Sequence, residues 1–122
     1  MKTVLIADDS KTTQLLVKTT LQRLPEVEFL SANNGKEALE LIDTRSVDLL
    51  VTDINMPEMD GVQLVREVRK TRSQQDLPIL IITAKGEVEA RTEGMANGAN
   101  AYILKPLSGR DLLQHAARLL EA

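Results

Sequence analysis

Five residues with reactive or metal-binding side chains stand at most two positions beyond the end of a short apolar run. If these runs are parallel strands, their carboxyl ends meet at one edge of a sheet, where neighbouring strands lie about 4.8 Å apart. Side chains at that edge can converge on a single site. The five residues are three carboxylates, one hydroxyl and one amine: Asp8, Asp9, Asp53, Thr83 and Lys105.

Three clustered carboxylates require a cation, because each close pair repels by up to about 4 kcal/mol at an effective dielectric constant near 20. Oxygen ligands favour a hard cation, Mg²⁺ before Ca²⁺. A carboxylate beside Mg²⁺ and a lysine can attack a phosphoryl group and form an aspartyl phosphate. The metal and the ammonium would neutralise charge on the phosphoryl oxygens, and a threonine hydroxyl can donate to one of them.

Each residue also has a simpler interpretation. Asp9 can cap a helix, and Asp53 can be an ordinary loop residue. Thr83 can be a β-branched strand terminus, and Lys105 a solvated surface amine. Each simpler interpretation is acceptable for its own residue, but together they leave the clustering of three carboxylates unexplained.

The elements that would position these residues alternate along the chain. Five short apolar runs predict strands, and the first, third and fourth are almost continuously apolar, as strands covered on both faces are. The second run contains Glu28, which favours a strand nearer an edge. The runs are Val4–Ala7, Val27–Leu30, Val47–Val51, Ile79–Ile82 and Ala101–Leu104.

Between the runs the apolar spacing becomes helical. Helix-capping signals occur at Asn34–Glu37 and Ser108–Asp111, and Pro25 is expected to stop the first helix after Leu24. The fourth helix, over about Glu87–Asn97, has few apolar anchors and is expected to be the least firmly packed. The other apolar stripes are Val17, Leu21 and Leu24; Ala38, Leu41 and Ile42; Gly61, Leu64, Val65 and Val68; and Leu112, Leu113, Ala116, Ala117 and Leu120.

Five strand–helix repeats predict an α/β fold with a doubly wound, five-stranded parallel sheet, right-handed crossovers and helices on both faces. The 122 residues, 43% of them hydrophobic, suit one domain over residues 1–122. No linker or second domain is visible, so we expect output through protein–protein contact unless an effector domain follows in a longer regulator.

Composition excludes several functions. The absence of cysteine removes disulfides and thiol catalysis, and a single histidine, His115, argues against a histidine-rich metal site. A net charge of −3 and two aromatic residues give no basis for nucleic-acid binding. The basic stretch Arg66–Arg72 is interpreted as a solvated helix face. No apolar run is long enough to span a membrane and no signal peptide is visible, so a cytoplasmic protein is expected.

The strand-end residues resemble the receiver domains of two-component response regulators, in particular stand-alone chemotaxis regulators. The resemblance covers essentially the whole chain, and five matches in order make it specific. It implies a flavodoxin-like fold with strand order 2-1-3-4-5. The matching motifs are Asp8-Asp9; Asp53 followed by Met56-Pro57 and Asp60-Gly61; Thr83-Ala84; and Tyr102-Ile103-Leu104-Lys105-Pro106.

This resemblance implies that Asp53 is the phosphoacceptor. It also implies that Asp8, Asp9, Asp53 and the backbone carbonyl of Asn55 bind Mg²⁺. Phosphoryl transfer would come from a sensor histidine kinase or a phosphotransfer protein, and a downstream effector protein would read the result. No direct nucleic-acid contact is implied, and the chain is expected to be a monomer or a weak phosphorylation-dependent dimer.

The resemblance assigns switch roles to the remaining motif residues. Lys105 would contact the phosphoryl group, and Thr83 would move to hydrogen-bond it. Tyr102 matches the family's switch aromatic, and Pro106 matches a position that commonly follows a cis peptide bond. Output would then occur at the face formed by the fourth helix, the fifth strand and the fifth helix.

Three other functions remain to be weighed. A phosphohydrolase with an aspartyl nucleophile would carry a second acid two residues beyond Asp8, where this chain has Ser10. A flavin- or nucleotide-binding module is disfavoured because the first loop, residues 9–13, contains no glycine. An inert interaction domain would have no reason to retain all five site residues. We therefore expect a signalling switch that is not an enzyme beyond self-phosphorylation from small donors and slow self-dephosphorylation.

Overall fold

The computed structural model describes residues 1–121 and contains a five-stranded parallel sheet in the order β2-β1-β3-β4-β5. This architecture and strand order confirm the predicted fold; Ala122, the last residue of the predicted domain, lies outside the described residues. The elements are β1 (Lys2–Ala7), α1 (Lys11–Leu21), β2 (Val27–Ala32), α2 (Gly35–Thr44), β3 (Leu49–Asp53), α3 (Gly61–Arg69), β4 (Ile79–Thr83), α4 (Val88–Ala96), β5 (Ala101–Leu104) and α5 (Gly109–Glu121).

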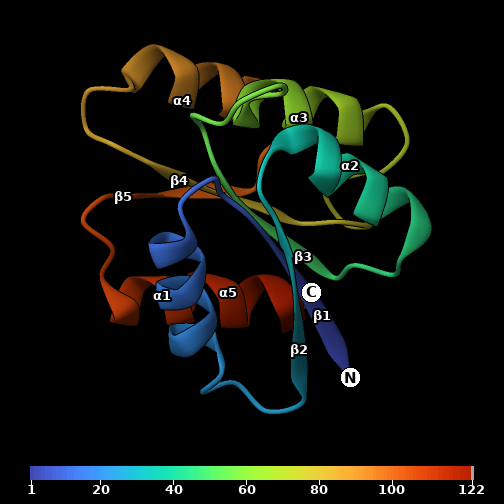
Figure 1. Ribbon diagram of the computed structural model, residues 1–122, viewed down its shortest axis with the longest axis vertical. Coiled ribbons are helices and arrows are strands. Elements are labelled where there is room, and N and C mark those ends of the chain that lie inside the picture. The colour runs from blue at the N-terminus through green and yellow to red at the C-terminus, as the bar shows by residue number, and fades with distance from the viewer. Residues whose placement is uncertain (122) are drawn as a thin grey trace.

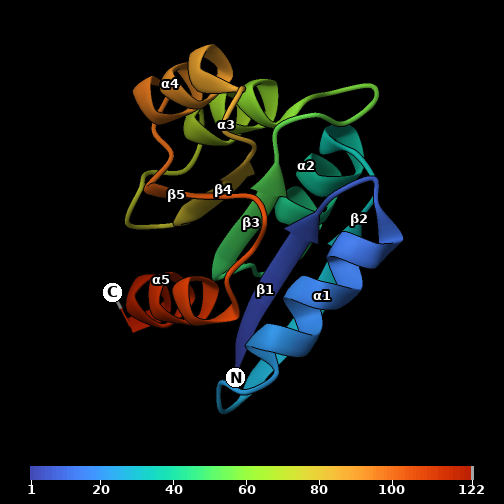
Figure 2. The same cartoon turned by 90° about the vertical axis from the view of Figure 1, so that its left-hand side faces the viewer.

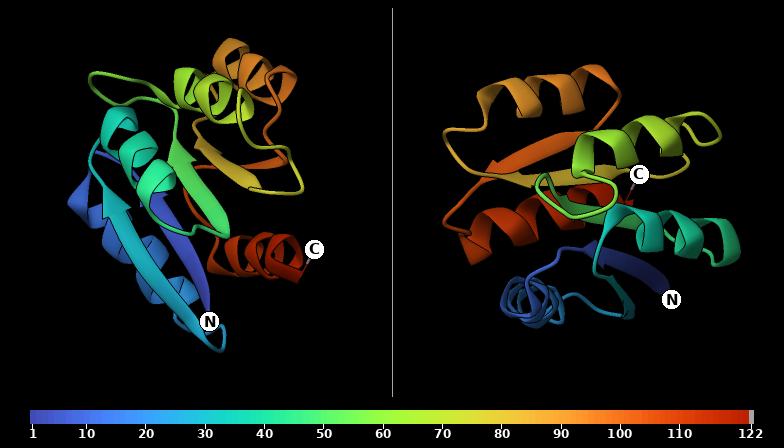
Figure 3. Two further views of the ribbon diagram at one scale, coloured as in Figure 1. Left: turned by 90° about the vertical axis from the view of Figure 1, so that its right-hand side faces the viewer. Right: turned by 45° about the horizontal axis from the view of Figure 1, so that its top comes forward.

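Helices cover both faces of the sheet (Figure 1). Helices α1 and α5 lie on one face and α2, α3 and α4 on the other, as the views in Figures 2 and 3 also show. Because side chains alternate along a strand, neighbouring residues of β1 enter different cores: Val4 packs with α1 and α5, whereas Leu5 packs with α2 and α3. The chain therefore has two apolar cores separated by the sheet.

Burial distinguishes the central strands from the edge strands. All residues of β3 and β4 are buried, and β1 is buried from its second residue onward, as the continuous apolar runs predicted. The edge strand β2 is only partly buried, which confirms the interpretation of the run containing Glu28. At the other edge, Tyr102 and Leu104 of β5 are 41% and 37% exposed.

Several predicted boundaries are wrong. Strand β1 begins two residues before its predicted run, and β2 ends two residues after its run. The third strand begins at Leu49 and ends at Asp53, two residues later than the run Val47–Val51, so Asp53 belongs to the strand. Helix α1 ends at Leu21 rather than Leu24 because the chain tightens into a turn, in which the Leu24 amide donates to the Leu21 carbonyl at 3.0 Å. Leu24 still packs against the core on the α1 side.

Both predicted helix-capping signals are confirmed, at Asn34 for α2 and at Ser108 for α5. Ser10 caps α1 by accepting from the Thr13 amide, so Asp9 is free of the capping role. A capping box that the sequence analysis did not identify joins Asp60 and Gln63 at the start of α3. Helix α4 has no side-chain cap, and within Val88–Ala96 Gly94 is the one buried residue, so α4 is weakly anchored as expected. No helix within residues 1–121 is long and apolar enough to cross a membrane.

The interpretation of the basic stretch as a solvated face is wrong for Arg69. Its guanidinium donates to the carbonyls of Gly98 and Leu77 at 2.9 and 2.8 Å and to the Asn100 side chain at 2.9 Å. Partial burial lowers the pKa of Arg69. Arg69 therefore has a structural role: it connects α3 to the loop before β4 and to the loop before β5.

Candidate functional site

The carboxyl ends of β1, β3, β4 and β5 lie at one edge of the sheet. Figure 2 shows the arrowheads of β1 and β3 at this edge. The register pairs Asp53 with Ile82 and Thr83 with Leu104, so the ends of β3 and β4 are offset by one residue and those of β4 and β5 are level. Asp8 directly follows β1 and Lys105 directly follows β5. The topology thus brings all five residues of the predicted site together.

The three carboxylates form the predicted cluster. One oxygen of each of Asp8, Asp9 and Asp53 lies within 4.8 Å of the others. Asp8 and Asp53 are 2% and 5% exposed, and Asp9 is exposed. Oδ1 of Asp8 accepts from the Ser10 amide at 2.8 Å, whereas Oδ2 is buried and lacks a hydrogen-bond partner among residues 1–121.

The electrostatics of Asp8 fit a cation site. Desolvation raises the pKa of Asp8 from 3.8 to about 6; the Ser10 amide and Lys105 oppose the shift, while Asp53 and Asp9 add to it. A buried carboxylate oxygen without a donor is costly, and a divalent cation would satisfy it. The ligands are all oxygens, which suits a hard cation. The cluster can therefore bind a metal ion.

Lys105 is the cation nearest to Asp53. Its Nζ lies 3.2 Å from Oδ1 of Asp53, and the Ile54 amide donates to the same oxygen at 2.9 Å. Burial raises the pKa of Asp53, Lys105 and the Ile54 amide oppose the rise, and the charge of Glu87 adds to it. Both hydrogen bonds use Oδ1, so among residues 1–121 Oδ2 of Asp53 accepts none and is available as a ligand or nucleophile.

Thr83 contacts a residue that the sequence analysis did not select. Its hydroxyl is fully buried and lies 3.3 Å from Oε1 of Glu87, to which the Ala84 amide also donates at 2.6 Å. The Asn55 side-chain amide donates to Oε2 of Glu87. Glu87 thus links the β4–α4 loop to the β3–α3 loop beside the acidic cluster. The only indication of this role in the sequence is that Glu87 follows Ala84 by three residues, which is the spacing of a capping box.

The remaining predicted site residues lie around this centre. Tyr102 points outward from β5, and the Arg91 guanidinium of α4 stacks over its ring at 4.9 Å from the centroid. The Lys105–Pro106 peptide bond is cis. Asn55 is exposed and lines a shallow hollow with Asp9. Tyr102 is therefore separate from the acidic cluster and in contact with α4.

Two further residues position the site without entering it. Buried Gln14 donates to the backbone carbonyls of Asp8 and Ala32 at 2.6 and 3.2 Å and so holds the ends of β1 and β2. The sequence indicates this buried position only through its spacing, because Gln14 lies on the same helix face as the apolar residues Val17 and Leu21. Gly61, at the start of α3, donates to the Ile54 carbonyl at 2.8 Å and fixes the residue next to Asp53.

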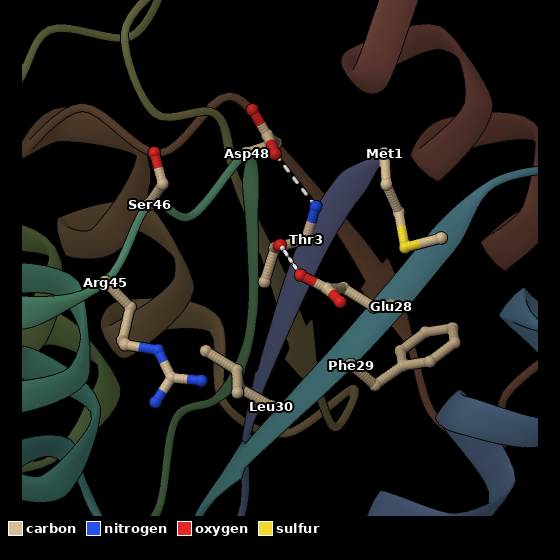
Figure 4. Close-up of a pocket in the computed structure, with 8 residues that line it drawn as sticks. All are labelled: Met1, Thr3, Glu28, Phe29, Leu30, Arg45, Ser46 and Asp48. Carbon is tan, nitrogen blue, oxygen red and sulfur yellow. Dashed lines mark hydrogen bonds between the residues drawn. The ribbon is translucent and has the colours of Figure 1, made fainter.

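A separate hollow of about 570 Å³ lies at the amino ends of the strands (Figure 4). There Thr3 donates through its hydroxyl to Glu28 at 2.9 Å and through its amide to Asp48 at 2.8 Å. These bonds join the starts of β1, β2 and β3, so both carboxylates have structural partners. The chemistry-bearing residues lie at the opposite edge of the sheet.

Comparisons with known proteins agree with this geometry. The model of the response regulator receiver domain matches residues 4–117. A chemotaxis protein CheY homolog of Campylobacter jejuni is 39% identical over 106 residues, which are 86% of this chain and 82% of the relative. The transcriptional regulatory protein SrrA of Staphylococcus aureus is 38% identical over 117 residues, 96% of this chain but 47% of SrrA. The structure of the chemotaxis response regulator CheY4 of Vibrio cholerae superposes with a TM-score of 0.86 at 34% identity, covering 98% of each chain.

Proposed function

The chain belongs to the response regulator receiver family, and we propose that it accepts a phosphoryl group on Asp53 from the phosphohistidine of a sensor kinase or phosphotransfer protein. A carboxylate oxygen of Asp53 attacks phosphorus, the P–N bond breaks, and the imidazole leaves and takes up a proton from solvent. The observation that carries this proposal is the pairing of buried Asp53 with Lys105 inside a cluster of three carboxylates.

We assign the metal site to Mg²⁺, with Asp8, Asp9, Asp53 and the backbone carbonyl of Asn55 as its ligands. When bound, the ion would neutralise negative charge on the carboxylates and on the transferring phosphoryl oxygens. The unpartnered buried Oδ2 of Asp8 supports this assignment. Lys105 holds Oδ1 of Asp53 and supplies a second positive charge to the phosphoryl group.

Phosphorylation then changes the surface formed by α4, β5 and α5. Thr83 turns towards the new phosphoryl oxygens, the loop Ala84–Gly86 follows, and Tyr102 rotates into the space that this movement opens. The weak anchoring of α4 and the exposed position of Tyr102 support this route. The partner is an effector protein that binds this surface, and neither nucleic acid nor a membrane is contacted directly.

The hydrolase alternative lacks a residue for its general acid. Its position, two beyond Asp8, is occupied by Ser10, whose hydroxyl accepts from the Thr13 amide as the cap of α1. A response regulator needs no such acid, because its phosphorylated state is the signal. The site therefore favours a switch.

Intact mass spectrometry after incubation with acetyl phosphate tests the proposal. With Mg²⁺ the protein should gain the mass of one phosphoryl group; with EDTA, or in Asp53→Asn, it should gain none. Labelling that persists in Asp53→Asn would remove Asp53 as the acceptor. Multiple turnover of a generic phosphate ester by the wild-type protein would instead support an enzyme.

A further inference from the structure

The Glu87 carboxylate occupies the donors that an anion bound next to Asp53 would need. A single oxygen, Oε1, accepts from the Ala84 amide at 2.6 Å and lies 3.3 Å from the Thr83 hydroxyl, which is also 3.3 Å from the Ala84 carbonyl oxygen. The other oxygen accepts from the Asn55 side chain. A hydroxyl and a backbone amide that converge on one anionic oxygen also suit a phosphoryl oxygen.

We propose that Glu87 is an internal substitute for the phosphoryl group: its carboxylate holds Thr83 and Ala84 in the unmodified protein, and phosphorylation of Asp53 displaces it. This inference rests on the proposed function. It adds that Glu87 sets the free energy with which the phosphoryl group is bound by Thr83 and Ala84. Binding of the phosphoryl group is then an exchange of one anion for another, and its net free energy is reduced by the contacts that Glu87 gives up.

The position of Glu87 connects this exchange to the output surface. Glu87 immediately precedes Val88, the first residue of α4, and its backbone amide donates to the Ala84 carbonyl at 3.0 Å. The same side chain ties the turn to Asn55 in the β3–α3 loop. Displacement of the carboxylate therefore removes the side-chain contacts that the start of α4 makes with both loops, and leaves only the backbone hydrogen bond to Ala84.

A purely structural role makes a different prediction. A glutamate that accepts from the amide three residues earlier is one half of a capping box, and the methyl side chain of Ala84 has no acceptor atom to supply the other half. If this were its only role, removing the side chain would lower stability without changing how well an anion binds at Asp53. The Thr83 and Asn55 contacts lie outside the capping geometry and indicate the additional role.

Titration with beryllofluoride, a phosphoryl mimic, in excess Mg²⁺ distinguishes the two roles. Glu87→Ala should bind the mimic about tenfold more tightly than wild type, the factor that corresponds to about 1.4 kcal/mol and to one charge-assisted hydrogen bond no longer given up. Glu87→Gln, which keeps an acceptor oxygen but loses the charge, should bind with intermediate affinity. Glu89→Gln is the matched control, since Glu89 lies exposed in the first turn of α4 and makes no hydrogen bond within residues 1–121; it should change affinity less than twofold.

The outcomes separate the inference from the function on which it rests. A wild-type protein that binds no beryllofluoride overturns the proposed function. A wild-type protein that binds it, with Glu87→Ala and Glu87→Gln no tighter than Glu89→Gln, overturns the role of Glu87 alone. The Ala84 amide resonance gives a second readout in folded protein: it should lie far downfield in wild type and shift upfield in Glu87→Gln, and an unchanged resonance contradicts the proposal.

Discussion

Gly61, the first residue of α3, packs directly against the carbonyl oxygen of Asp53, the last residue of β3. A Cβ on Gly61 would overlap this oxygen and would also lie 2.9 Å from Cα of Ile54. The obstacle is backbone, which cannot rotate away as a flexible side chain can. The close approach of α3 to the end of β3 therefore requires glycine at position 61. This contact fixes the position of the Asp53 backbone and hence of its carboxylate.

Gly61→Ala should therefore impair both folding and phosphorylation. We expect a loss of about 1–3 kcal/mol in the free energy of unfolding, because the helix must move away from the strand. Phosphorylation by acetyl phosphate should slow as Asp53 moves relative to Lys105. Gly86→Ala is the matched control, since a Cβ there meets no atom within 4 Å; equal stability of the two variants in urea denaturation would contradict this account.

Magnesium should stabilise the protein more at neutral than at acidic pH. The folded pKa of Asp8, about 6, lies above its ordinary 3.8, so the metal-free protein binds more protons than its unfolded chain between these values. The contribution of Asp8 to stability is therefore present below pH 3.8 and is lost as the pH rises through about 6. Above that pH the buried charge remains uncompensated until a cation binds.

The Mg²⁺-induced rise in Tm, measured at roughly pH 5 and pH 7.5, checks this prediction. We expect the larger rise at the higher pH, and a smaller rise with little pH dependence in Asp8→Asn. If Asp8→Asn kept the wild-type response to Mg²⁺, the acidic cluster would not be the metal site.

Replacing Lys105 should separate metal binding from phosphorylation. The ammonium lies 3.2 Å from Asp53, so Lys105→Met removes a positive charge that competes with a cation at the cluster. Mg²⁺ should bind several-fold more tightly, while phosphorylation by acetyl phosphate should slow about tenfold or more because charge on the phosphoryl oxygens loses a stabilising partner. Isothermal titration and the phosphorylation time course measure the two effects, and a parallel loss of both would contradict the assigned role.

Tyr102→Ala should weaken the output without affecting acceptance of the phosphoryl group. Tyr102 is 41% exposed and stacks with Arg91 of α4, away from the acidic cluster. Coupling between sites is typically about 1–3 kcal/mol, so beryllofluoride should change partner affinity roughly 5- to 150-fold in wild type and less in the variant. Mass spectrometry should show normal phosphorylation of Tyr102→Ala; if phosphorylation were lost as well, Tyr102 would belong to the acceptor site.

The strands and the clustering of the site residues were predicted from the sequence because both depend on residue patterns along the chain. Apolar runs mark buried strands, and parallel strands bring Asp8, Asp53 and Thr83 to one edge. The order 2-1-3-4-5 itself came from the family resemblance, since spacing alone does not decide which strand lies next to which.

The details that sequence did not predict depend on side-chain direction and local backbone. Glu87 looked like an ordinary residue at the start of a weak helix, and only its rotamer places the carboxylate against Thr83. Arg69 looked like part of a charged helix face, but its guanidinium donates to the Leu77 carbonyl before β4 and to the Gly98 carbonyl before β5. Neither contact follows from helical or strand periodicity.

Amide hydrogen exchange with and without beryllofluoride tests the central claim most directly, namely that a phosphoryl group on Asp53 is transmitted to the α4–β5–α5 surface. In Mg²⁺ the mimic should change the exchange of amides from Thr83 to Arg91 and in β5, while exchange in α2, on the far side of α3, should not change. Asp53→Asn should show no change with the mimic. Wild-type exchange that is unaffected by a bound mimic, or that changes equally in α2, would contradict the account.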